Sequence, residues 1–205
     1  MGQRTQTFIR ILAGGKPRVL AFHDQWGFGR PTILKLWNLY QFFQAARISN
    51  ASGGTQFPSS ERSVLGAVRL GSSTGTAFLE NLLSVSPEHG VYSPTTLEEG
   101  FKNVADFSND GGYLFVDLTQ ESLIRYAFAR SRGDGKVQVE GVGPTQDYWE
   151  AHQNTGVDWE EAYLQQIDTL ARELDESPST ELLSRESLAE LFPVTKQDCV
   201  ATSAT

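Results

Sequence analysis

The spacing of apolar residues changes period along the chain, and each change predicts an element. Two β-rich runs, residues 7–12 and 18–23, flank a short segment that contains Gly14 and Gly15. These glycines permit the positive φ angles of a tight turn. We therefore predict an antiparallel hairpin at the start of the chain.

An almost entirely apolar segment follows the hairpin. Residues 32–46 contain eight large aliphatic or aromatic side chains, and Lys35 is their only charge. Pro31 suits the first turn of a helix, where its missing N–H would have no partner. We predict a helix that begins at Pro31, ends near Ala46 and is buried on most of its sides.

A period of two returns in the middle of the chain. Residues 113–118 and 124–129 alternate between two faces, and residues 136–141 have one polar face, as at the edge of a sheet. We predict an α+β fold in which these three strands and the hairpin form an antiparallel sheet covered by helices. Shorter helices are predicted at residues 59–70, 75–83 and 97–107.

The C-terminal quarter is predicted to be helical and acidic. Residues 158–161 have the spacing of a capping box, and an apolar stripe continues to about Glu176. After a break at Pro178, a last amphipathic helix carries Leu182 and ends near Phe192. The predicted organisation is an α+β core (1–156), an acidic helical segment packed on it (157–192) and a mobile tail (193–205).

The composition excludes several classes of protein. The single cysteine, Cys199, allows no internal disulfide and no multi-cysteine metal site. Nowhere do about 18 uncharged apolar residues follow one another, so no membrane span is predicted. We expect a soluble protein that needs no cofactor.

The net charge of −8 is unevenly distributed. Residues 1–50 hold seven lysines and arginines against one acid, whereas residues 157–192 hold ten acids against two arginines. The favoured interpretation is that these two segments attract each other within the fold. The alternative is that one end meets an acidic partner or nucleic acid while the other end mimics or repels it. We expect the partner to be a protein rather than nucleic acid, and we expect no contact with a membrane.

His23 and Asp24 form the only histidine–aspartate adjacency, where a strand leads into a helix. A metal site would also need His89, Glu150 or His152, and the spacing of these residues matches no ligand pattern. The favoured interpretation is therefore a structural turn that Asp24 caps and in which His23 is hydrogen-bonded. No metal site is predicted.

A hydrolase is the alternative interpretation of the same region. The free N-terminal amine of Gly2 would act as the base, with His23 and Asp24 nearby. Because Gly2 supplies no nucleophile, we predict no catalytic residue.

Trp26, Phe28 and Arg30 are the predicted binding residues. They alternate with two glycines just before the apolar helix, so aromatic rings and a permissive backbone lie together. The segment lacks the third glycine of a dinucleotide fingerprint. The alternative is that its rings pack under the helix.

Short motifs resemble those of a family of small phage and prophage proteins. Met1-Gly2-Gln3-Arg4 and, after the hairpin, Gln25-Trp26-Gly27-Phe28 resemble the family's opening Met-Gly-Thr-Arg and its turn Gln-Trp-Asp-Gly-Tyr-Pro. Residues 109–113 resemble a second, looser match. This chain has Gln3 for the threonine and lacks the aspartate after the tryptophan. The resemblance implies a viral context, in the host cytoplasm or the virion, and no catalytic residues.

Three hypotheses for function remain open. The leading hypothesis is a phage-related protein that acts by protein–protein contact and is not an enzyme. The second is the hydrolase with Gly2, His23 and Asp24. The third is mimicry of nucleic acid by the acidic residues 157–192.

Overall fold

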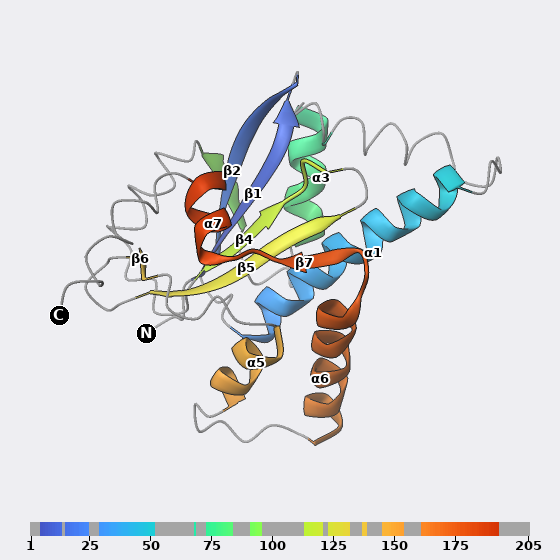
Figure 1. The fold of residues 1–205 in the computed structure, drawn as a ribbon, viewed down its shortest axis with the longest axis vertical. Coiled ribbons are helices and arrows are strands. Elements are labelled where there is room, and N and C mark those ends of the chain that lie inside the picture. Colours follow the sequence, from blue (N-terminus) through green and yellow to red (C-terminus); the bar gives the residue numbers. More distant parts are fainter. Residues whose placement is uncertain are drawn as a thin grey trace.

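The computed structural model describes residues 5–13, 15–24, 29–51, 68, 73–83, 91–95, 113–120, 123–131, 137–138, 145–153 and 161–192. The strands are β1 (Thr5–Ala13), β2 (Lys16–Asp24), β3 (Val91–Thr95), β4 (Tyr113–Asp117), β5 (Ile124–Ser131), β6 (Val137–Gln138) and β7 (Thr180–Leu182). The helices are α1 (Arg30–Ala51), α3 (Ser73–Leu83), α5 (Thr145–Gln153), α6 (Glu161–Glu176) and α7 (Arg185–Leu191). Figure 1 shows a sheet with helices around it, so the α+β class is confirmed.

The predicted N-terminal hairpin is present. β1 and β2 pair antiparallel without a break, from Thr5 opposite Asp24 to Ala13 opposite Lys16. Gly15 in the turn has a φ of 76°, in the left-handed region that favours glycine. The local turn residues and the alternating strands thus form the hairpin with no distant contact required.

The sheet as a whole is mixed, which corrects the prediction of an antiparallel sheet. Its strand order is β3-β2-β1-β4-β5-β6, with β7 also paired to β5. β1 runs parallel to β4 and β5 runs parallel to β7, whereas the other neighbouring strands are antiparallel. Parallel neighbours need a long crossover connection. The chain between β2 and β4, which includes α1 and α3, provides it.

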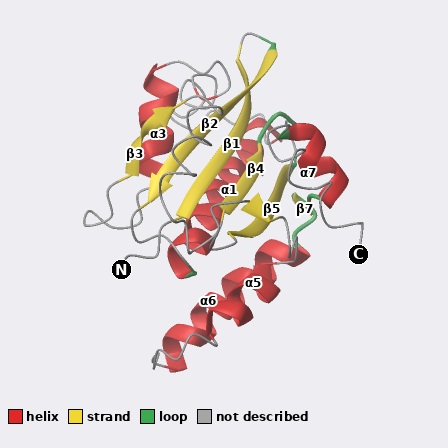
Figure 2. Cartoon of the chain, turned by 90° about the vertical axis from the view of Figure 1, so that its left-hand side faces the viewer, coloured by secondary structure: helices red, strands yellow, loops and turns green. Residues whose placement is uncertain are grey.

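The helices cover the two faces of the sheet unequally. α1, α3, α5 and α6 contribute to one apolar core with Ile9, Val116 and Phe128 of the sheet. We call this side the helix face. The opposite side, the α7 face, carries a smaller core in which Leu188 and Phe192 pack on Phe115 and its neighbours. Figure 2 shows α1 behind the strands and α7 beside β5 and β7.

α1 is surrounded by other groups on nearly all sides, as predicted from its composition. Ile33, Leu36 and Leu39 are wholly buried, and Gln41 is the one exposed residue among those whose burial is described in this helix. The helix is longer than predicted and begins at Arg30. It therefore serves as the central support of the helix face.

The C-terminal prediction is wrong at Leu182. Residues 180–182 form β7, and α7 begins only at Arg185, after Ser184 accepts a hydrogen bond from the Ser187 N–H. The cause is the open edge of β5: Ile124 N donates to Ser179 O at 2.9 Å and Leu183 N to Tyr126 O at 2.7 Å. These backbone bonds outweigh the helical spacing of the leucines.

Some of the other predicted elements are confirmed, and some lie outside the described residues. The strands at 113–118 and 124–129 and the helix at 75–83 are confirmed as β4, β5 and α3, and β6 ends the strand order as an edge strand should. β3 and α5 were not predicted. The predicted helices at 59–70 (except Val68) and 97–107, the capping residues 158–160 and the tail 193–205 lie outside the described residues.

No helix of the described chain is long and apolar enough to cross a membrane.

Candidate functional site

The predicted site residues are only partly described. His23 and Asp24 belong to β2 and not to a turn, with backbones opposite Gln6 and Thr5. Their side chains, and all of Gly2, Trp26 and Phe28, lie outside the described part. Arg30, the first residue of α1, is half-buried. The described chain therefore does not show these residues brought together.

A charged network on the α7 face is the most elaborate polar arrangement among the described residues. Arg10 of β1, Asp117 of β4 and Arg125 of β5 stand side by side because the strand registers align them. The adjacent row consists of Phe8, Phe115 and Ala127, which belong to the core under α7. The network thus begins where the apolar core of this face ends.

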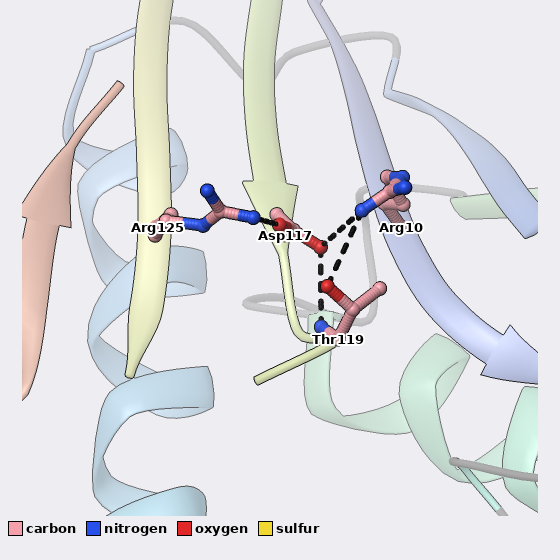
Figure 3. A network of polar contacts seen from close by, with 4 residues as sticks. All are labelled: Arg10, Asp117, Thr119 and Arg125. Atoms are coloured by element: carbon pink, nitrogen blue, oxygen red, sulfur yellow. Dashed lines mark hydrogen bonds and ion pairs between the residues drawn. The ribbon is translucent and has the colours of Figure 1, made fainter. Parts of the chain in front are cut away.

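The carboxylate of Asp117 holds the network together (Figure 3). Arg10 Nη1 donates to Oδ1 at 3.3 Å, Thr119 N donates to Oδ1 at 3.1 Å, and Arg125 Nη2 donates to Oδ2. Arg10 Nη1 also donates to Thr119 Oγ1 at 3.2 Å. These charge-assisted bonds fix both guanidinium groups.

The burial of the network limits what it can do. The Asp117 side chain has no exposed surface, whereas the side chains of Arg10 and Arg125 are 16% and 18% exposed. A carboxylate enclosed in this way cannot meet a substrate as a base or nucleophile. The two arginines reach solvent. Their two positive charges exceed the single negative charge of Asp117 by one.

The hairpin extends beyond this network. β4 pairs with β1 only from Gln6 to Arg10, but the β1–β2 ladder continues to Ala13 opposite Lys16. We call the described residues of the projecting part, 12–13 and 15–18, the hairpin tip; it is uppermost in Figure 1.

The hairpin tip combines an apolar residue with free cations. Leu12 is 36% exposed and is the one exposed large hydrophobic side chain in the described chain. Lys16, Pro17 and Arg18 are also exposed. Among the residues that the structure describes, Lys16 and Arg18 find no acid to pair with. The favoured internal pairing of the basic N-terminal segment with residues 157–192 is therefore not seen here, since Arg10 pairs instead with Asp117.

Lys35 is an unpredicted feature of the core. It lies on α1 and only 1% of its surface is exposed. Burial lowers the pKa of its ammonium group to about 7, because the charged form loses its hydration. An amine enclosed in this way is not accessible to a substrate, and its effect is on stability.

A second buried polar cluster joins the sheet to two helices. Asp175, in the last turn of α6, accepts hydrogen bonds from Tyr126 OH at 2.5 Å, Thr145 N at 2.8 Å and Gln146 N at 3.0 Å. It therefore caps the first turn of α5, whose N–H groups have no helical partner. Burial, with the hydrogen bond to Asp175, raises the pKa of Tyr126. The cluster is structural.

The sequence contains part of the pattern that indicates the charged network. Asp117 and Arg125 each interrupt an apolar strand at a position that shares its face with buried residues. A charge in such a position indicates a partner on a neighbouring strand. The partner itself follows only from the register of β1 against β4.

Comparison with family models, curated proteins and solved structures found no match to this chain.

Proposed function

We propose that the protein is phage-related, acts by contact with another protein and catalyses no reaction. The contact surface is the hairpin tip, with the guanidinium groups of Arg10 and Arg125 at its base. The single observation that carries this proposal is a projecting hairpin that exposes Leu12 on one side and, on the other, Lys16 and Arg18, for which the described residues offer no acid. The viral context rests on the resemblance of the N-terminal motifs.

The chemistry of the tip is that of a small interface. Interfaces between proteins combine an apolar centre with a polar rim, and arginine is enriched in them. The ladder from Thr5 to Ala13 pairs the strands that lead to the tip, so ordering these strands costs little conformational entropy on binding. The network around Asp117 fixes the base of the same hairpin.

The charge of the tip indicates an acidic partner. Lys16 and Arg18 offer two positive charges that the described chain does not neutralise. The whole chain carries −8 and repels nucleic acid at long range. A protein with exposed carboxylates suits the tip better.

The hydrolase hypothesis has less support. Asp117 and Lys35 are the described groups with the most unusual environments, and both are buried away from solvent. The positions that this hypothesis uses, Gly2 and the side chains of His23 and Asp24, lie outside the described part.

Photo-cross-linking tests the proposal. Leu12 is replaced by p-benzoylphenylalanine in the full chain, and the protein is irradiated in extracts of cells that express it. We expect a covalent adduct with a protein, lost when Lys16→Glu and Arg18→Glu are added. Gln41, exposed on α1, carries the cross-linker in the control. No adduct from position 12, or equal adducts from both positions, would overturn the proposal.

A further inference from the structure

We propose that the hairpin tip binds the outer face of α6 in a second copy of the chain, so that copies associate head to tail. This inference rests on the proposed function, since it names the partner of the same surface. Figure 1 shows the hairpin tip and α6 toward opposite ends of the molecule's longest axis. Each copy therefore has a basic end and an acidic end.

The outer face of α6 carries negative charge, opposite in sign to the charge of the tip. Its exposed charged residues are Glu161, Glu173 and Glu176 with one arginine, Arg172, and half-buried Asp168 adds a further acid. Ile167 and Leu174, on the opposite side of the helix, are buried. The acids are thus held outward by a helix whose inner side is fixed to the core.

The acids of α6 lie along one exposed stripe of the helix. Glu173 and Glu176 follow Thr169 on this stripe, one and two turns further on. Their carboxylates are placed to meet Lys16 and Arg18, which stand opposite Ala13 and Ile11 in the hairpin register and share one side of the tip.

Charge decides which surfaces meet. Tip against tip would oppose Lys16 and Arg18 to themselves, and α6 against α6 would oppose glutamates to glutamates. The unlike pairing, tip to α6, brings opposite charges together. A heterologous contact of this kind closes into a ring or continues as a filament, and an antiparallel twofold dimer would form the same contact twice.

The test uses charge reversal in the purified full-length chain. The hairpin variant carries Lys16→Glu and Arg18→Glu, and the α6 variant carries Glu173→Lys and Glu176→Lys. All four positions are exposed, so thermal melts are expected to show that both variants fold. Sedimentation velocity at about 0.05 M and 0.5 M salt, where screening differs strongly, measures association.

We expect wild-type protein to form species larger than a monomer at low salt and to lose them at high salt. Each variant alone should remain monomeric, because both of its ends then have the same sign. An equimolar mixture should recover the assembly, because every tip again meets an α6 of opposite charge. Gln41→Glu, at an exposed position of α1 outside both surfaces, is the charge-changing control and should assemble as wild type does.

The outcomes separate this inference from the proposed function. In purified protein the cross-linker at position 12 should form a dimer adduct whose peptide maps to α6. Adducts only in cell extracts would overturn self-association and leave the proposed function standing. An adduct that joins tip to tip, or a monomeric wild type at low salt, would also overturn it. Binding of duplex DNA by wild type, lost in the hairpin variant, would overturn both.

Discussion

Lys35 is the residue whose surroundings conflict most with its chemistry. An ammonium group in an apolar core loses its hydration, and the pKa falls from 10.5 to about 7. The surrounding fold therefore opposes the protonated form and favours the neutral amine. Lys35 stands one helical turn before Leu39, and both side chains are buried.

Stability should consequently rise with pH above neutrality. Between about pH 7 and 10.5 the unfolded chain binds a proton at Lys35 that the native chain does not, so the free energy of unfolding increases through this window. The difference amounts to at most about 5 kcal/mol, at about 1.4 kcal/mol for each pH unit. Below pH 7 both states are protonated and the full cost of the buried cation remains. Urea unfolding at pH 6, 7, 8 and 9 measures the slope.

Lys35→Met is the matched control, because it keeps an unbranched side chain only one atom shorter and removes the charge. We expect a smaller slope and a more stable protein at pH 6. An unchanged slope would mean that other groups cause the pH dependence.

Asp117→Asn should destabilise the fold by about 2–4 kcal/mol, since two guanidinium groups then face each other without their shared carboxylate. This loss of stability is smaller than that expected for a fully buried ion pair, because both arginines reach solvent. Glu181→Gln is the control: Glu181 is exposed and stands opposite Arg125 in the β5–β7 register. Equal losses of stability in the two variants would show that the enclosed position of Asp117 has no special importance.

At the scale of elements, those that depend on neighbouring residues could be predicted from the sequence. Those that depend on residues far away in the chain could not. The hairpin and α1 depend on neighbouring residues: glycines in a turn, alternation, and an apolar run. β7 depends on the open edge of β5, and α5 begins where a carboxylate from α6 caps it. The alignment of Arg10, Asp117 and Arg125 depends on a parallel pairing of distant strands. None of these partners is recorded in the local pattern.

The capping of α5 by Asp175 gives a prediction at this scale. Asp175→Ala removes two bonds to the α5 backbone and one to Tyr126, so we expect a loss of about 1–3 kcal/mol. Amide hydrogen exchange in α5 should accelerate more than in β4, because α5 loses its anchor while the sheet keeps its own pairs. Glu176→Ala, at the exposed next position, should change stability by less than about 0.5 kcal/mol. Similar losses in both variants would contradict the capping role.

At the scale of the whole molecule, the C-terminal elements are integrated with the rest. Ile167 and Leu174 of α6 share a core with β1, β4 and α1, and β7 extends the sheet beside β5. We therefore predict that the chain through Phe192 unfolds in one transition. Limited proteolysis combined with circular dichroism measures this. A folded fragment that ends near Asn154 would instead identify residues 157–192 as a separate unit.

The parallel pairing of β1 with β4 also affects how the protein is made. Arg10 and Asp117, which lie side by side in the sheet, are 107 residues apart in the chain. During synthesis at about 5–20 residues per second, β1 leaves the ribosome roughly 5–20 s before the strand that covers its inner edge. For that time the hairpin has an open row of backbone donors and acceptors, to which strands of other nascent chains can add. Crowded expression should thus produce aggregates nucleated at β1, and slower initiation of translation should reduce them.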